Sequence, residues 1–433
     1  MARVAVILRW LVIARLLFHV FYLPVFEGPD EPFHLGRAST FVDQGMVAGL
    51  QGDRLDLAIS ASIAAHPCWA GLAEQFGCPT FTGHGAEFNI LGAPEAIPQD
   101  RRVENYQSHQ PPLYYLSAAV VLAVSDQLAP DSEAPKKRLL TLRLLSVFLV
   151  ALALFWPIRV LGQAQGAGWE SAFLTFLLMP GAVESLARVA NDTAVFLWCA
   201  FLVASLHQSE TGGPGKILGI YVLLAIGPLI KLTALPVAVF AAFVLLKESG
   251  RWVAIKALLA AGVVMPFQLL RGWAWGGTLE MAAIGEALRE PPGDIVLGVL
   301  HSVYTFIKTA FWLGGWSVFR PPFALVIALG LLLLAGAFLL APSRSPKRLE
   351  AHLAGTLLAA AGFVAFAIGK WGVFKVWGGV GGWYLWPWAP WIAILLADLT
   401  RLRHRSKPVL ILLTGGWLLV ATVFWFIAAN DLY

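Results

Sequence analysis

Long apolar runs alternate with short polar segments along most of the chain. The clear apolar runs are residues 4–26, 139–161, 169–187, 193–208, 216–231, 232–247, 252–270, 323–341, 351–369, 386–400 and 409–428. Several of them reach the roughly 20 apolar residues that a helix needs to cross a bilayer. Two further runs, 113–128 and 295–316, are short or interrupted by charge. The pattern predicts an all-α polytopic membrane protein with about 11 to 13 transmembrane helices.

The composition agrees with this prediction. Hydrophobic residues make up 58% of the chain and charged residues only 13%, whereas soluble domains carry about a quarter charged residues. The net charge is +5, and the Lys and Arg residues lie in short clusters between the apolar runs. We therefore expect contact with membrane lipids and no nucleic acid partner.

The distribution of basic residues predicts the topology. Residues 4–26 are too long for the apolar core of a signal peptide, and no small-residue cleavage site follows, so we expect a retained first span. The positive-inside rule then places the clusters at residues 3–9, 247–251, 344–348 and 401–407 in the cytoplasm. If only the clear runs cross, the segments 27–138, 188–192, 271–322 and 370–385 lie outside, and the two doubtful runs lie in the interface or re-enter.

One basic cluster, Lys136 to Arg138, violates this scheme because it would lie outside. Counting the two doubtful runs as spans corrects it but moves Lys247 and Arg251 outside. We expect a single membrane domain, 1–433. Its parts are a large first outer loop with juxtamembrane helices (27–138), a helical module (139–270), an outer or interfacial segment (271–322) and C-terminal transmembrane helices (323–433).

An unusual polar stretch, "FEGPDEPFHL" (residues 26–35), follows the first span. Pro32 suits the first turn of a helix, so we expect Asp30 or Glu31 to cap a helix that ends near Gly45. Side chains three apart share a helix face. The polar residues at the outer end of the first span are therefore Asp30, Glu31, His34 and Arg37. A capped juxtamembrane helix with a solvated face would also explain them.

Two later stretches are also polar near an expected membrane boundary. "SHQPPLYYL" (108–116) places His109 before a double proline and an aromatic pair. "MPGAVESLARVANDTAVF" (179–196) places Arg188, Asn191 and Asp192 between two spans. Ionisable groups at membrane depth are costly and usually face a cavity or a partner. A simple loop would explain them too, but the expected topology puts them on the same side as Asp30.

These three stretches, in this order, resemble the GT-C superfamily of polyprenyl-phosphate-sugar glycosyltransferases. The likeness is greatest to an uncharacterised bacterial membrane family, and the chain is more distantly similar to aminoarabinose transferases and protein O-mannosyltransferases. It is clearest over residues 1–235. The resemblance implies a GT-C-like helical bundle in the inner membrane of a bacterium, with its outer loops in the periplasm. It implies an undecaprenyl-type phosphate sugar donor. It also implies a glycan, lipid or protein acceptor in the periplasm.

The resemblance also implies residue roles. An acid of the first-loop pair activates the acceptor hydroxyl in such enzymes, which gives the catalytic role to Asp30, with Glu31 as the alternative. A hydroxyl that attacks an anomeric carbon needs a nearby base, and a leaving lipid phosphate needs cations. The residues expected at the substrate are His34, Arg37, His109, Asn191, Asp192, Lys231, Arg271 and Tyr384. Lys231 has a second interpretation, as a lysine that extends from a helix end to the membrane surface.

The likeness weakens toward the C-terminus. "LLRGWAWGGTLEM" keeps Arg271 but departs from the relatives at Gly272 and Gly277, and "GGWYLWP" carries Trp383 where the relatives carry Arg. The identity of the donor is therefore open. No spacing is specific for a metal site, so no cofactor is firmly predicted, although Asp30, His34, His109 and Asp192 could hold a divalent ion.

Two of the three cysteines lie in the long polar loop and the third in an apolar run. Cys68 and Cys78 share the long polar loop and would form a disulfide if that loop is extracytoplasmic, whereas Cys199 is expected to pack in a span.

A transporter or flippase for a lipid-linked sugar is one alternative to an enzyme, and a non-catalytic scaffold for polysaccharide assembly is another. The absence of internal repeats, and charges that lie at the outer boundary, count against a transporter.

Overall fold

The computed structural model describes residues 2–22, 30–51, 110–128, 134–208, 214–266, 295–300, 349–374 and 382–399, with single positions 55, 59, 105, 107, 302 and 303. The regular structure of these residues is helical, without a strand. The all-α prediction is confirmed for this part of the chain.

The helices follow the apolar runs, and several begin at a proline. The α-helices are α1 (Ala2–Tyr22), α2 (Glu31–Asp43), α3 (Gly45–Gln51), α6 (Leu113–Leu128), α7 (Ala134–Phe155), α8 (Pro157–Gln165), α9 (Ala167–Leu177), α10 (Pro180–Ala187), α11 (Asp192–Gln208), α12 (Pro214–Ile230), α13 (Leu235–Ser249), α14 (Arg251–Ala261), α19 (Leu349–Phe374) and α20 (Ala389–Leu399). Two 3-10 helices are η4 (Leu232–Ala234) and η5 (Gly382–Trp388). Proline occupies the first turn of α8, α10 and α13, where its missing N–H costs nothing.

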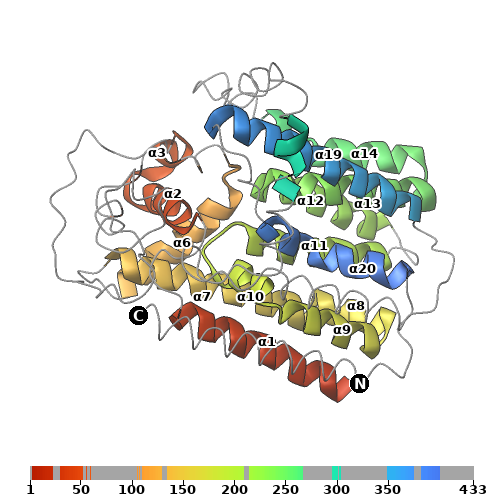
Figure 1. Ribbon diagram of the computed structural model, residues 1–433, viewed down its shortest axis with the longest axis horizontal. Coiled ribbons are helices and arrows are strands. Elements are labelled where there is room, and N and C mark those ends of the chain that lie inside the picture. The colour runs from red at the N-terminus through yellow and green to blue at the C-terminus, as the bar shows by residue number, and fades with distance from the viewer. Residues whose placement is uncertain are drawn as a thin grey trace.

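The long helices lie side by side, with α2 and α6 at one end of the bundle (Figure 1). α1 packs along α7 and α9, and α11 lies centrally against α7, α8, α12 and α20. α13 packs between α14 and α19, while α2 packs mainly on α6. The start of α2, the start of α6 and the α10–α11 connection therefore come together at the same end.

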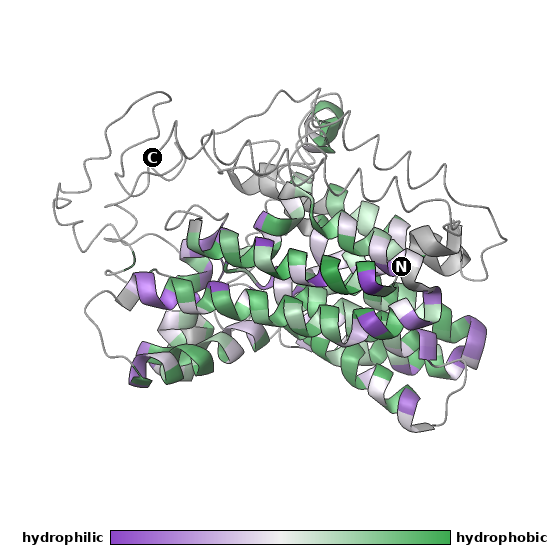
Figure 2. Cartoon of the chain, turned by 90° about the horizontal axis from the view of Figure 1, so that it is seen from below, coloured by the Kyte–Doolittle hydropathy of each residue, from purple (hydrophilic) through white to green (hydrophobic). Residues whose placement is uncertain are grey.

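Within the described ranges, three helical stretches are long and apolar enough to cross a membrane: Ala2–Phe21, Pro135–Gln165 and Leu232–Ser249. α10 and α11 qualify together as a fourth, although they meet at 104°. Figure 2 shows apolar residues along the helices and hydrophilic residues mainly toward their ends. The protein is thus an α-helical membrane protein, and the expected total of spans stays a prediction.

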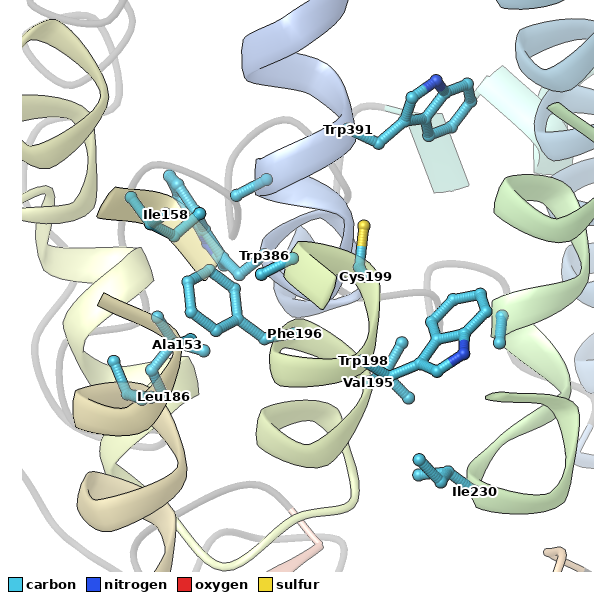
Figure 3. Close-up of a cluster of buried hydrophobic side chains, with 14 of the residues drawn as sticks. Ala153, Ile158, Leu186, Val195, Phe196, Trp198, Cys199, Ile230, Trp386 and Trp391 are labelled. Carbon is cyan, nitrogen blue, oxygen red and sulfur yellow. The ribbon is translucent and has the colours of Figure 1, made fainter. Parts of the chain in front are cut away.

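The core of the bundle forms around α11. Val195, Phe196, Trp198 and Cys199 leave this helix in different directions, and Trp386 of η5 lies beside Phe196 (Figure 3). Cys199 is free and buried, which confirms the packing prediction. The indole of Trp386 is fully buried. The C-terminal helices η5 and α20 are therefore part of the same core as the N-terminal ones.

The basic cluster at the start of α7 has acidic partners. Arg138 donates to both carboxylate oxygens of Asp43 at 2.7 Å and to Asp126 at 2.9 Å. Lys137 lies 3.7 Å from Asp126. The cluster therefore joins the ends of α2 and α6 to α7, and its charge is largely neutralised. The positive-inside rule counts basic residues but not their partners.

Candidate functional site

The break between α10 and α11 forms the centre of the candidate site. The helices meet at 104° across residues 188–191. Arg188, Asn191 and Asp192 are all at most 1% exposed. A chain that turns inside the protein must find partners for its backbone polar groups. Ser146 Oγ of α7 donates to the Arg188 carbonyl oxygen at 2.9 Å, and the Val189 N–H donates to a Glu31 oxygen at 2.8 Å.

Glu31 is held in a buried ion pair. Arg143 Nε and Nη2 donate to its two carboxylate oxygens at 2.9 and 2.6 Å, and the two side chains are 0% and 4% exposed. With the Val189 bond, Glu31 connects α2, α7 and the α10–α11 break. The expected proximity of the first-loop acids to the Asn191–Asp192 segment is therefore confirmed for Glu31. A carboxylate held so completely is poorly suited to take a proton from a substrate.

Asp192 is held by two cations. Arg188 Nη2 lies 3.0 Å from one carboxylate oxygen, and Lys231 Nζ lies 2.6 Å from the other. Lys231 sits between α12 and η4 and is 5% exposed. The interpretation of Lys231 as a side chain that extends to the membrane surface is therefore wrong. Its ammonium stays inside because the Asp192 carboxylate compensates the cost of burying the charge.

Asp30 has a different environment. It is partly exposed, although the α2 residues Glu31 to Phe41 are all buried. Its φ is 63°, which makes it the one non-glycine residue with positive φ among the described residues. The expectation that Asp30 caps α2 with its side chain is wrong: the side chain makes no capping hydrogen bond, and the backbone carbonyl oxygen of Asp30 accepts from Phe33 and His34. A left-handed backbone costs about 1–3 kcal/mol and recurs at functional sites.

His34 and Arg37 are packed on Tyr115. His34 Nδ1 lies 2.8 Å from the Tyr115 hydroxyl, with the two rings stacked 5.8 Å apart. The Arg37 guanidinium lies 4.3 Å from the centre of the same ring and donates to the carbonyl oxygens of Gln107 and Gln110. Burial first, and then the charges of Lys231 and other nearby cations, lower the pKa of His34 well below its ordinary value. His34 is therefore a neutral imidazole at neutral pH.

Among the residues that the structure describes, the site holds more buried positive than negative charge. Its buried cations are Arg37, Arg143, Arg188 and Lys231, and its carboxylates are Glu31, Asp192 and the partly exposed Asp30. The Asp30 charge acts on both Tyr115 and Lys231, so the three groups are neighbours. Buried charge without full compensation is expensive. An anionic group near Asp30 would balance it.

Several predicted residues cannot be placed. His109, Arg271, Cys68 and Cys78 lie outside the described residues. Tyr384 belongs to η5, but its side chain is outside the described set. Within the part of the chain that the structure describes, no group of three or more His, Cys, Asp or Glu side chains could hold a metal ion. The possible four-residue metal set includes His109, so it stays a prediction.

The sequence interpretation missed Arg143 and a second set of buried charges. Arg143 lies within the apolar run 139–161, and a charge in such a run is itself a signal of function. On α1, Arg9 donates to Glu170 of α9, while Arg15 and His19 are 8% and 0% exposed. The expectation that the charges lie only at the outer boundary is therefore wrong, since α1 is a candidate span.

The fold and this ionic site define a polytopic α-helical membrane protein with buried charges at one end of its bundle. The chain matches the family described as predicted membrane protein (DUF2142) over residues 15–390. Because the match covers most of the chain, the protein belongs to this family. No curated protein and no solved structure matches it.

Proposed function

We propose that the protein is a membrane glycosyltransferase. It moves a sugar from a polyprenyl phosphate carrier to an acceptor hydroxyl outside the inner membrane. The proposal follows the resemblance to the GT-C superfamily and the arrangement of the site. The acceptor is a glycan, a lipid or a protein, and Asp30 is the general base.

The partial exposure of Asp30 carries the proposal. Glu31 and Asp192 each hold two or more close polar partners, so they stabilise the site. Asp30 alone of these carboxylates is partly exposed, on a backbone turned into the left-handed region. A general base must come within hydrogen-bond reach of the proton that it removes. This makes Asp30 the preferred base and removes the reason for choosing Glu31.

The neighbouring cations suit the leaving group. Breaking the bond between the anomeric carbon and the phosphate oxygen leaves a lipid phosphate with increased negative charge. Fixed cations in a site of low dielectric stabilise such charge without reorganisation. Arg37 of α2 and Lys231 are both buried, and the charges of both act on His34. Lys231 also holds Asp192, so one cation serves both the fold and the leaving group.

The test compares two acid-to-amide substitutions in a strain from which the gene is deleted. Asp30→Asn should abolish the sugar modification that the wild-type gene restores, as measured by mass spectrometry of envelope glycans, lipids and proteins. Asp43→Asn is the matched control, because Asp43 lies on the same helix but pairs with Arg138 away from the site. Equal amounts of folded protein are checked by size-exclusion chromatography. Full modification with Asp30→Asn would refute the role of Asp30.

The buried charges on α1 favour a second candidate function, translocation of a lipid-linked sugar. Ionisable groups inside spans often mark a substrate path, and Arg9, Arg15 and His19 are buried on a candidate span. Reconstituted vesicles distinguish the functions: redistribution of a labelled lipid-linked sugar without a new glycosidic bond favours a transporter. A scaffold would tolerate loss of Asp30 in both assays.

A further inference from the structure

The buried polar groups at the site include two neutral ones, on α6 and directly before α11, that have no hydrogen-bond partner within the described part of the chain. They are the hydroxyl of Tyr114 and the side-chain oxygen of Asn191. Their residues are 3% and 0% exposed. A buried polar group without a partner is costly, and native proteins rarely leave one without a reason. One group donates and the other accepts, so a ligand hydroxyl suits both.

The two neighbouring tyrosines of α6 differ in this respect. The Tyr115 hydroxyl bonds to His34 at 2.8 Å and donates to Gln107 at 3.4 Å. The Tyr114 ring packs edge-on against Tyr115 and His34, at centroid distances of 5.3 and 6.4 Å, but its hydroxyl has no such bond. The protein thus uses the Tyr115 hydroxyl for its own structure and leaves the Tyr114 hydroxyl for another partner.

Asn191 stands directly before α11, where an asparagine side chain usually accepts a backbone N–H of the first turn. Here its side-chain oxygen has no donor among the described residues, although the Asn191 carbonyl accepts from Val195 in the ordinary way. Its amide nitrogen lies 3.5 Å from the Ile230 carbonyl oxygen, which fixes the side chain. Asp30 before α2 likewise does not cap its helix. Both residues are of the capping type, and neither uses its side-chain oxygen to cap its helix.

The two groups belong to one site. Asn191 adjoins Asp192, and the charges of Asp192, Glu31 and Arg188 all act on the Tyr114 hydroxyl. α6 also packs against α12, which ends beside Lys231. Tyr114 and Asn191 therefore flank the ionic cluster that we assign to the lipid phosphate and the acceptor.

We propose that Tyr114 and Asn191 recognise hydroxyl groups of the transferred sugar, with the Tyr114 hydroxyl donating and the Asn191 oxygen accepting. This inference rests on the proposed function and assigns the two residues as determinants of sugar specificity. They distinguish a carrier that bears a polyhydroxyl group from the bare carrier phosphate. Neither residue takes part in proton transfer or in bond breaking.

The first measurement is the melting temperature of full-length protein in detergent without added lipid. Tyr114→Phe removes a hydroxyl that has no partner, so it should leave the melting temperature unchanged or raise it. Tyr115→Phe is the matched control, and it should lower the melting temperature because His34 loses its hydrogen bond. A fall with Tyr114→Phe as large as that with Tyr115→Phe would contradict the inference.

The second measurement is binding of undecaprenyl phosphate, undecaprenyl phosphate glucose and undecaprenyl phosphate mannose. Tyr114→Phe and Asn191→Ala should each weaken binding of the sugar-bearing lipid about fivefold to tenfold and leave the bare lipid unchanged. Equal loss for all three lipids, or no loss, overturns the inference while the proposed function stands. A wild-type protein that binds none of the lipids overturns both.

Discussion

The buried pair of Glu31 and Arg143 gives a prediction with a calculable size. Glu31→Gln keeps the shape and the acceptor for the Val189 N–H but leaves the Arg143 charge uncompensated. The partners are 0% and 4% exposed and bonded at 2.6 and 2.9 Å. Removing one member of such a pair costs about 3–5 kcal/mol, because the other charge stays buried. We expect a loss of this size in the free energy of unfolding.

The assay is unfolding of the purified protein by SDS in mixed micelles, followed by tryptophan fluorescence. Four proteins form a double-mutant cycle: wild type, Glu31→Gln, Arg143→Met and the double variant. The double variant should lose less than the sum of the single variants, since neither charge is then left alone. The partly exposed pair of Asp43 and Arg138 is the control, and Asp43→Asn should cost no more than about 1 kcal/mol.

Two results would refute this reasoning. A loss with Glu31→Gln no larger than that with Asp43→Asn would mean that the pair is not buried as described. Additive losses in the cycle would mean that the two charges do not interact. A variant that stays fully stable but loses sugar transfer would return Glu31 to the role of catalytic base.

Two further predictions follow from burial and packing. Burial lowers the pKa of His34, so the folded protein keeps this side chain neutral. Below about pH 6.5 the unfolded chain binds a proton at His34 that the folded chain does not. The free energy of unfolding should therefore fall by up to about 1.4 kcal/mol for each pH unit below that value. Melting curves between pH 7.5 and 5 check this, and an unchanged slope in His34→Gln would contradict it. In α12, a Cβ at Gly227 would overlap the Trp198 ring, so Gly227→Ala should cost about 1–3 kcal/mol. Gly219 has no atom of the described residues within 4 Å of an added Cβ, so Gly219→Ala should not destabilise the protein. Equal melting temperatures for the two variants would argue against the packing described.

Apolar length and proline position were enough to locate most of the described helices. α6 has the bounds of the doubtful run 113–128, and α2 ends at Asp43, close to the expected Gly45. Residues 169–187 were expected as one span but form α9 and α10, because Pro180 starts a new helix. Local sequence therefore fixes where a helix can begin, while the angle between helices depends on packing.

The partners of the charged residues could not be predicted. The pairs Glu31–Arg143 and Arg9–Glu170 join residues that are 112 and 161 positions apart. A single sequence marks a charge in an apolar run as costly, but it does not say which distant charge compensates it. The same limit affected Asp30 and Glu31, which are adjacent in sequence and chemically alike. Their surroundings differ in the structure. Glu31 is buried in an ion pair, whereas Asp30 lies at the turn before α2 and is partly exposed.

The Glu31–Arg143 pair also has a consequence for biosynthesis. An arginine near the centre of a helix opposes insertion into the bilayer by about 2.5–3.5 kcal/mol, and Arg143 lies inside the candidate span Pro135–Gln165. Glu31 leaves the ribosome before Arg143, so its carboxylate is already present when α7 enters the membrane. We expect α7 to insert less efficiently in a truncated protein whose translation begins after α2. The order of the helices along the chain would then contribute to correct assembly.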